Sequence, residues 1–140
     1  ISITSDIIVG FPGETYEDFK QTLEVVKKVE FTSLFTFIFS PRDGTKAASM
    51  EDTVPREEKV KWFQELLDTQ EKIAQKRCAG MKGQECRVLV EERNVKNGFL
   101  SGRTDGSVIV EFPAGDEYIG KFVNVRINEA RNWILRGEII

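Results

Sequence analysis

The stretch Asp6-Ile7-Ile8-Val9-Gly10-Phe11-Pro12-Gly13-Glu14-Thr15 decides the fold of the first half of the chain. Its apolar run, residues 7–9, is short and continuous, which is typical of a strand buried on both faces of a parallel sheet. Two glycines and a proline follow, and they predict a tight turn. Thr15 then predicts the N-cap of a helix, with Asp18 completing a capping box. The stretch therefore predicts a strand, a turn and a helix start.

The predicted turn is a candidate ligand site. In α/β folds, ligands bind at the carboxyl ends of parallel strands, and glycines there let a ligand approach the backbone closely. A connection that binds nothing is the alternative, and spacing alone leaves both open.

The following elements complete a βαβ unit with one further helix. Apolar residues at helical spacing predict a helix over residues 15–29, and the aromatic and β-branched residues 31–40 predict a second buried strand parallel to the first. Residues 53–76 predict a second helix. The residues expected to pack that helix are Val60, Phe63, Leu66, Leu67 and Ile73, and Trp62 is expected to extend this face, with contact to a partner as the alternative.

The loop after the second strand, Ser40-Pro41-Arg42-Asp43-Gly44-Thr45-Lys46-Ala47-Ala48, is expected at the same sheet edge as the glycine turn. Parallel strands point the same way, so their carboxyl ends meet at one edge. Ser40 and Arg42 would then form part of a ligand rim. A loop that only reverses the chain is again the alternative.

The hydrophobic pattern changes to period two after a glycine-containing boundary at residues 79–83, so we expect domains at 1–78 and 79–140. Five short strands separated by turn signals predict an all-β second domain. They lie near residues 87–91, 99–104, 108–112, 123–128 and 133–137. Five strands of this length suit a small closed barrel of the oligonucleotide-binding type, because an open sheet would expose its edges.

Composition limits the chemistry. The 140 residues contain no histidine and two cysteines, Cys78 and Cys86, which excludes most metal and triad chemistry within the chain and predicts reduced thiols and a cytoplasmic location. No apolar run is long enough for a membrane helix, so no membrane partner is expected. The chain begins at Ile1 rather than Met, which indicates a fragment of a longer protein.

Charge is distributed unevenly along the chain. The net charge of −3 divides into −5 for residues 1–74, with 9 basic and 14 acidic residues, and +2 for residues 75–140, with 11 basic and 9 acidic residues. The second half therefore permits nucleic-acid binding without requiring it. The basic residues expected to face solvent there are Arg87, Arg103, Lys121, Arg126 and Arg131. Arginine pairs with phosphate and stacks on bases, but ordinary solvated charges are the alternative.

Two sets of motifs resemble a known family. The first set is Ser5-Asp6-Ile7-Ile8-Val9-Gly10-Phe11-Pro12-Gly13-Glu14-Thr15, Phe39-Ser40-Pro41-Arg42-Asp43-Gly44-Thr45-Lys46-Ala47-Ala48 and Val54-Pro55, which resembles the radical S-adenosylmethionine methylthiotransferases. The second set is Arg87-Val88-Leu89-Val90-Glu91, Gly102-Arg103-Thr104, Gly120 with Val123-Asn124-Val125-Arg126-Ile127, and Leu135-Arg136-Gly137, which resembles the TRAM domain of those enzymes. Residues 40–45 are most similar to the branch that adds a methylthio group to N6-isopentenyladenosine beside the tRNA anticodon.

The resemblance implies a fold and binding sites. The fold would be α/β followed by all-β: part of a TIM-like radical S-adenosylmethionine barrel, made of the βαβ unit and its helix, and then a five-stranded TRAM barrel similar to the oligonucleotide-binding fold. The residues implied to lie along S-adenosylmethionine are Val9, Gly10, Phe11, Pro12, Phe37, Phe39, Ser40 and Arg42. The residues implied to contact a tRNA anticodon stem-loop are Arg87, Arg103, Thr104, Lys121, Arg126 and Arg131.

One departure from the family limits what the chain does alone. The Cys-x3-Cys-x2-Cys motif and the N-terminal domain, which ligate two 4Fe–4S clusters in these enzymes, are absent from the sequence. The resemblance therefore implies S-adenosylmethionine and both clusters for a full-length parent, with no catalytic or metal residues here. Asp43 stands where the family often has proline.

Three alternatives remain open at this level. The parent could modify threonylcarbamoyl-adenosine in tRNA or an aspartate of a ribosomal protein, or the barrel could be a free-standing RNA-binding module. An incomplete sheet also leaves strand edges unpaired, so we expect oligomers through those edges.

Overall fold

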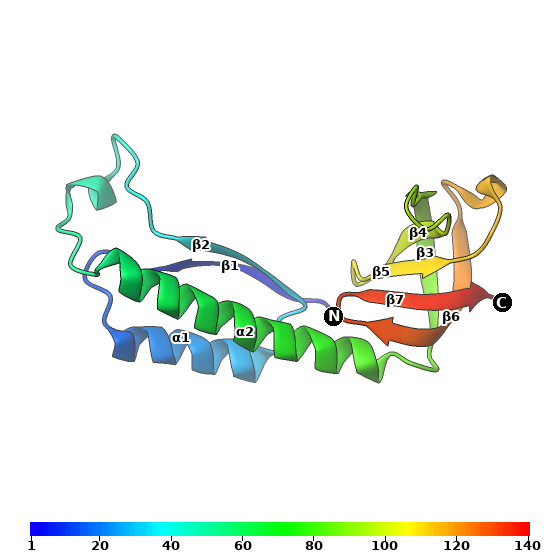
Figure 1. Cartoon of the computed structure of the whole chain (residues 1–140), viewed down its shortest axis with the longest axis horizontal. Helices are drawn as coiled ribbons and strands as arrows, with labels where there is room; N and C mark the ends of the chain where they lie inside the picture. The colour runs from blue at the N-terminus through cyan, green and yellow to red at the C-terminus, as the bar shows by residue number, and fades with distance from the viewer. The chain divides into compact units, whose positions relative to one another are not determined.

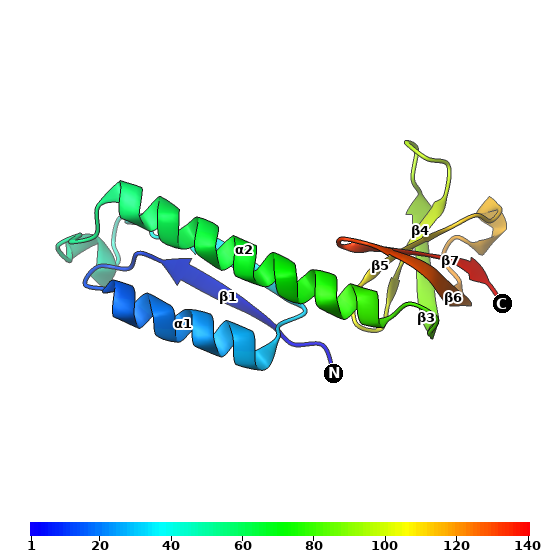
Figure 2. The ribbon, with the colours of Figure 1, turned by 60° about the horizontal axis from the view of Figure 1, so that its bottom comes forward.

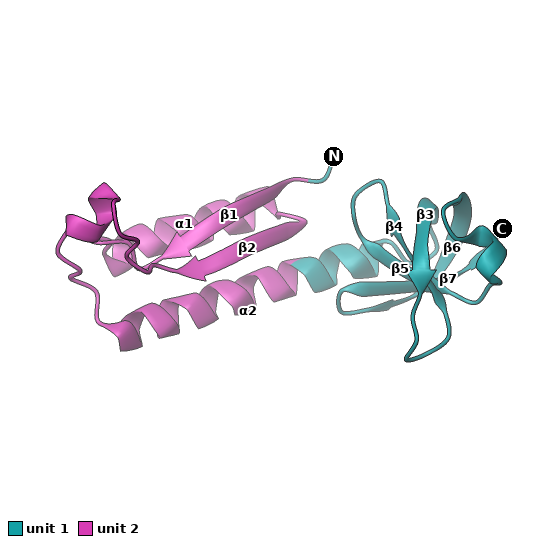
Figure 3. Ribbon diagram, turned by 90° about the horizontal axis from the view of Figure 1, so that it is seen from above, with its two compact units in different colours: residues 1–2, 74–140 teal, residues 3–73 magenta.

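The structure is a computed structural model that describes residues 1–140. The chain divides into two compact units, which we describe separately (Figure 3). Residues Ile3–Ile73 form the first, called here the α/β unit. Ile1–Ser2 and Ala74–Ile140 form the second, called the barrel unit. No helix in the structure has the length and apolar character needed to span a bilayer.

The α/β unit contains the predicted strand–helix–strand order. Its elements are β1 (Thr4–Val9), α1 (Tyr16–Val29), β2 (Ser33–Ile38), a 3-10 turn η1 (Lys46–Ser49) and α2 (Arg56–Gly80), of which α2 continues beyond the unit. Strands β1 and β2 pair in parallel, as the sequence predicts. Both helices lie on the same side of the two strands (Figures 1 and 2).

Local signals set the start of α1. The Thr15 side chain accepts a hydrogen bond from the Asp18 N–H at 3.2 Å, and the Asp18 carboxylate accepts one from the Thr15 N–H at 2.9 Å. This reciprocal pair is the predicted capping box. Phe19, Leu23 and Val26 form the buried face of the helix, so the predicted helical periodicity is also confirmed.

The two strands are buried on one face only, which corrects the prediction of strands buried on both. Val9 is fully buried beneath the helices, whereas Ile8, Phe35 and Phe37 are 52%, 60% and 55% exposed. Side chains alternate between the faces of a strand, so one set meets α1 and α2 and the other meets solvent. The register places Ile8 beside Phe37 on this open face.

Helix α2 differs from its prediction in length and in its packing face. It ends at Gly80 rather than Lys76. Val60 and Leu67 are 48% and 37% exposed, so their predicted packing role is wrong. The buried residues of α2 within the α/β unit are Lys59, Trp62, Leu66, Gln70 and Ile73, a stripe spaced three or four residues apart that includes two polar side chains.

The barrel unit contains the predicted closed five-stranded barrel. Its strands are β3 (Glu85–Arg93), β4 (Leu100–Thr104), β5 (Ile109–Phe112), β6 (Phe122–Arg131) and β7 (Ile134–Ile139). They close in the order β3-β4-β5-β7-β6, and only the β5–β7 pair is parallel. The fully or nearly fully buried residues of the barrel core are Val88, Val90, Leu100, Val110, Phe112, Val125, Ile127 and Leu135. Their alternation matches the period-two pattern of the sequence.

Candidate functional site

The turn between β1 and α1 is closed by the carboxylate of Glu14. Its Oε2 atom accepts hydrogen bonds from the backbone N–H groups of Gly10 and Phe11. The Glu14 N–H donates in turn to the carbonyl oxygen of Phe11 at 2.9 Å. Gly10 has a φ of +73°, a conformation that favours glycine. Both N–H groups at the strand end are therefore occupied within the turn itself.

An ion pair between a buried lysine and an exposed aspartate packs against this turn. Lys59 is only 4% exposed, and its Nζ donates to both carboxylate oxygens of Asp52, at 2.6 and 2.7 Å. This hydrogen bond lowers the pKa of Asp52 below its usual value. The aliphatic stem of Lys59 fills the space above Gly10, so that a Cβ at Gly10 would overlap Lys59 Cγ. The ion pair thus links α2, the turn after β1 and the loop that precedes α2.

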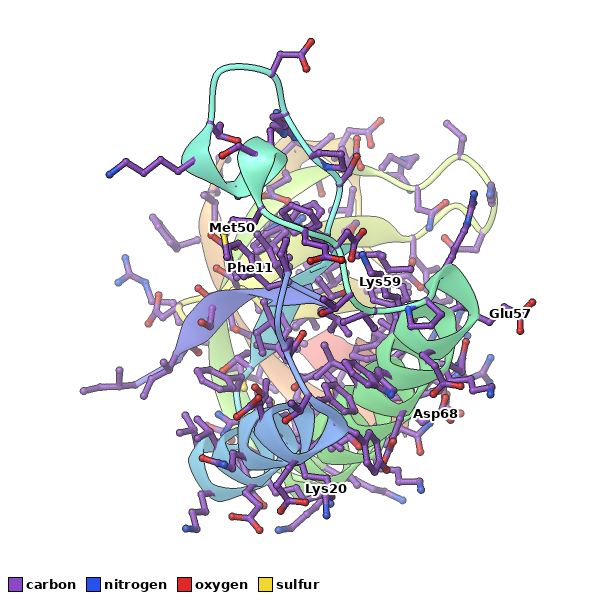
Figure 4. The ribbon with its side chains drawn as sticks, turned by 90° about the vertical axis from the view of Figure 1, so that its left-hand side faces the viewer. Phe11, Lys20, Met50, Glu57, Lys59 and Asp68 are labelled. Carbon is purple, nitrogen blue, oxygen red and sulfur yellow. The ribbon has the colours of Figure 1, made fainter.

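Two aromatic rings complete what we call the strand-end cluster: Gly10, Phe11, Phe39, Asp52 and Lys59. The Phe39 N–H extends the β1–β2 pairing by donating to the carbonyl oxygen of Val9 at 2.8 Å. The rings of Phe11 and Phe39 meet edge to face with centroids 5.2 Å apart, and Lys59 Nζ lies 5.3 Å from the Phe39 centroid. Figure 4 looks onto this end of the unit, with Phe11 and Lys59 labelled.

The structure brings some of the residues expected near S-adenosylmethionine together. Gly10, Phe11 and Phe39 belong to the strand-end cluster, and Phe37 lies on the adjoining open face. The side chain of Val9 points into the helix-covered core, and Pro12 is also buried. Ser40 and Arg42 are exposed in the loop after β2. The Arg42 carbonyl accepts hydrogen bonds from the backbone and hydroxyl of Thr45, which gives that loop a tight turn.

The outer surface of three barrel strands carries three of the six predicted RNA contacts, Arg87, Arg103 and Arg126. Phe122 of β6 pairs with Leu89 of β3, which pairs on its other side with Arg103 of β4. Arg87 of β3 pairs with Asn124 of β6. Residues on either side of these positions face the core, so this set faces outward. We call this surface the β6–β3–β4 face.

The arginines of this face differ in their partners. Arg103 Nε lies 3.2 Å from a Glu91 oxygen, and Arg126 forms a 3.0 Å ion pair with Glu85. Arg87 has no carboxylate partner and lies over the exposed ring of Phe122, with its guanidinium carbon 4.0 Å from the ring centroid. The sequence alone did not distinguish these three arginines. The strand register does, because it decides which of them has a carboxylate partner.

The other predicted RNA contacts lie elsewhere or are exposed beside this face. Lys121 is exposed and directly precedes β6. Thr104 is the last residue of β4, is half-buried, and its hydroxyl accepts a hydrogen bond from the Val108 N–H at 3.2 Å. Arg131, expected in a turn, is the last residue of β6 and pairs with Glu129 at 2.7 Å. Thr104 and Arg131 are therefore not grouped with Arg87.

The cysteines do not fit an iron–sulfur cluster. No three side chains of His, Cys, Asp or Glu are grouped so that they could hold a metal ion. Cys78 is buried in the barrel core, Cys86 packs partly buried against the same core, and burial raises the pKa of both thiols. Cluster ligands are cysteine thiolates, and burial disfavours the thiolate form of both residues. Any cluster of a parent enzyme would need ligands from outside these residues.

The sequence did not single out four residues of the strand-end turn and cluster and of the β6–β3–β4 face. These residues are Glu14, Asp52, Lys59 and Phe122. A signal existed for Lys59, because it stands at a core position of the stripe that continues through Trp62 and Leu66. A signal also existed for Phe122. It is the first residue of β6 and is apolar, although its position in the alternation places it on the face opposite to Val125 and Ile127. No pattern pointed to Asp52, since it lies in a loop.

Comparisons with known proteins find similarity to both units of the chain. Residues 80–140 match the family model described as the TRAM domain. Over the whole chain, the protein is 51% identical to the tRNA-2-methylthio-N(6)-dimethylallyladenosine synthase of Caldicellulosiruptor saccharolyticus, across 140 residues that make up 30% of that relative. It is 48% identical to the enzymes of the same name from Acetivibrio thermocellus and Nitrosospira multiformis, covering 100% and 99% of this chain and 29% of each relative.

The chain thus spans about 30% of the length of the curated relatives that it matches. The match is continuous through the α/β unit and the barrel unit, since it covers 100% of the chain. By sequence the chain is similar, over its whole length, to part of the tRNA-2-methylthio-N(6)-dimethylallyladenosine synthases, and its residues 80–140 match the TRAM domain.

Proposed function

We propose that this chain is part of a radical S-adenosylmethionine enzyme that adds a methylthio group to N6-isopentenyladenosine beside the tRNA anticodon. The observation that carries the proposal is the 51% identity, along the whole chain, to a tRNA-2-methylthio-N(6)-dimethylallyladenosine synthase. Identity at this level spans both units, so it supports a common role for the two rather than a shared module alone.

In this proposal the α/β unit supplies part of the wall of a TIM-like barrel. A barrel of this type has helices outside and side chains inside, and the β1–β2 sheet has one helix-covered face and one open apolar face. The carboxyl ends of its strands carry the strand-end cluster, where ligands of such barrels bind. The open face with Ile8, Phe35 and Phe37 would face the barrel interior.

The residues present fit a role beside S-adenosylmethionine, which supplies the radical chemistry when bound. Phe37, Phe39 and Phe11 offer apolar and aromatic surface at the strand ends, and Ser40 and Arg42 follow on an exposed loop. Val9, Gly10 and Pro12 would shape the site through the backbone, since Val9 and Pro12 are buried and Glu14 holds the Gly10 N–H. The 4Fe–4S clusters would be held by other parts of the parent.

The barrel unit supplies RNA binding in this proposal. Its β6–β3–β4 face combines Arg87, Arg103 and Arg126 with an exposed aromatic ring, and Lys121 lies beside it. Positive charge attracts phosphates, and aromatic rings stack on unpaired bases. Thr104 and Arg131 would then act at the margin of the contact with an anticodon stem-loop.

Mass spectrometry of tRNA nucleosides tests the proposed function. In cells that lack the full-length gene, the 2-methylthio group should disappear while N6-isopentenyladenosine remains. An unchanged methylthio-isopentenyl signal would refute the proposal. Loss of methylthio-threonylcarbamoyl-adenosine, or of a methylthio group from a ribosomal protein, would assign the enzyme to the corresponding other branch.

A further inference from the structure

The outer surface of the barrel unit holds an aromatic side chain that the core does not use. Phe122 is 54% exposed and lies outside the buried core of the barrel. It sits diagonally across the β3–β6 pair from Arg87, because Phe122 pairs with Leu89 and Arg87 pairs with Asn124. The Arg87 guanidinium lies 4.0 Å from the ring centroid and covers one side of the ring.

The electrostatic environment of Arg87 is unusual in this unit. Five other arginines of the barrel unit each form an ion pair with a carboxylate: Arg93 with Asp116, Arg103 with Glu91, Arg126 with Glu85, Arg131 with Glu129 and Arg136 with Glu111. A paired arginine must exchange its carboxylate for a phosphate before it can bind RNA. Arg87 has no such competitor, and its guanidinium contacts the Phe122 ring instead.

We infer that Arg87 and Phe122 form a stacking site for one unpaired RNA base and its adjacent phosphate. The exposed ring and the guanidinium plane give a flat surface of the kind on which single-stranded bases stack. The guanidinium N–H groups remain available to a phosphate oxygen. The inference rests on the proposed RNA role and refines it, because it assigns the main contact to one pair and a secondary role to Arg103 and Arg126.

The surroundings of the pair suit single-stranded RNA better than a duplex. Leu89 lies next to Phe122 in the cross-strand row and is half-buried, so it adds apolar surface beside the ring. Lys121 adds an exposed positive charge directly before Phe122. A duplex buries its base faces in its own stack, so only an unpaired loop or end can use an aromatic surface.

The test measures RNA affinity of the 140-residue chain by fluorescence anisotropy at several salt concentrations. One labelled RNA is a stem with an unpaired loop, and the other is a fully paired stem of the same length. The variants are Phe122→Leu, Phe122→Trp and Arg87→Gln. Lys96→Gln is the matched control, because it removes an equal charge from an exposed residue in the loop between β3 and β4, outside the predicted RNA contacts.

Phe122→Leu should weaken binding of the loop RNA by about 10-fold and leave the paired stem within about 2-fold, because leucine keeps apolar bulk and loses the stacking surface. Phe122→Trp should retain the wild-type affinity. Arg87→Gln should weaken loop binding by about 10-fold and reduce the slope of log affinity against log salt by about 0.7 to 0.9. Lys96→Gln should change loop binding by less than about 2-fold, because Lys96 belongs to no part of the proposed contact.

Two results would overturn the inference in distinguishable ways. If the wild-type chain binds the loop RNA but Phe122→Leu and Arg87→Gln match it, or Lys96→Gln costs as much as Arg87→Gln, the stacking site is wrong and the RNA role stands. If the wild-type chain binds neither RNA, the RNA role of this chain fails and the stacking site fails with it. Circular dichroism melting of each variant verifies that these exposed substitutions leave the fold intact.

Discussion

At the scale of single residues, Gly10 and Lys59 depend on each other. Gly10 leaves the space that the Lys59 stem occupies, and Lys59 in turn reaches Asp52 across that space. The motif around Gly10 predicted a turn, and a turn is present. The partner could not be predicted, because contacts between residues about 50 positions apart follow from packing rather than from local pattern.

Gly10→Ala should destabilise the α/β unit more than Gly13→Ala. Both glycines have positive φ, +73° and +84°, so each substitution adds backbone strain of ~1 kcal/mol. Only at Gly10 does the new Cβ meet Lys59, whereas nothing lies within 4 Å of a Cβ at Gly13. The overlap should raise the total cost at Gly10 to ~3 kcal/mol. Urea unfolding of both variants measures the difference, and equal midpoints would contradict the proposed packing.

Asp52→Asn should remove one acid-sensitive contribution to stability. The Lys59 hydrogen bond lowers the folded-state pKa of Asp52, so the charged form stabilises the fold above the unfolded pKa of about 3.9. That contribution is lost as pH falls through the folded-state value. The wild-type melting temperature should therefore drop more steeply below about pH 4 than that of the variant.

Asp43→Asn serves as the control for the pH experiment, since it removes the same charge from an exposed loop residue. This control should follow the wild-type pH profile. A profile of Asp52→Asn that is superimposable on the wild-type profile would show that the Lys59–Asp52 pair contributes nothing to folding.

At the scale of elements, the sequence predicted the start of α1 correctly. It did not predict which faces of the strands are covered by other elements. The capping box placed the start of α1, because its residues are adjacent in sequence. The apolar runs of β1 and β2 were read as doubly buried strands, yet Ile8, Phe35 and Phe37 lie on an open face. A run of apolar residues indicates that the side chains are suited to burial. It does not indicate which neighbouring element covers them.

The open sheet face should cause self-association of the isolated chain. Apolar side chains at Ile8 and Phe35 are 52% and 60% exposed, and β1 and β2 each have an unpaired edge. Sedimentation velocity should show dimers or larger species whose share rises with concentration. The double substitution of Ile8→Thr and Phe35→Thr should shift the chain toward monomer.

Val25→Thr provides a matched control for that experiment. Val25 is 53% exposed, as Ile8 is, but it lies on α1 away from the open face. It should leave the association unchanged. A wild-type chain that remains monomeric at every concentration would contradict the prediction.

At the scale of the whole molecule, the barrel unit was predicted more completely than the α/β unit. Alternating residues such as Val88 and Val90 predicted both the strands and their inward faces, because period-two burial needs only local sequence. The difference between Arg87 and Arg126 was not predictable. It depends on which carboxylate the strand register brings alongside, and Glu85 is 41 positions from Arg126.

Both units are similar to the same relatives, because the similarity runs along the whole chain. One unit would line the site where S-adenosylmethionine binds, and the other would hold the RNA. Their roles are separable by experiment, because loss of RNA affinity and loss of methylthio transfer are different measurements.

The most direct test of the central claim is the ratio of 2-methylthio-N6-isopentenyladenosine to N6-isopentenyladenosine in tRNA. We would measure it in a strain without the full-length gene, in that strain carrying the intact gene, and in that strain carrying the gene without the segment for residues 80–140. We expect a ratio near zero without the gene, full recovery with the intact gene, and little recovery without the TRAM domain. A ratio that stays at the wild-type level in the strain without the gene would contradict the account.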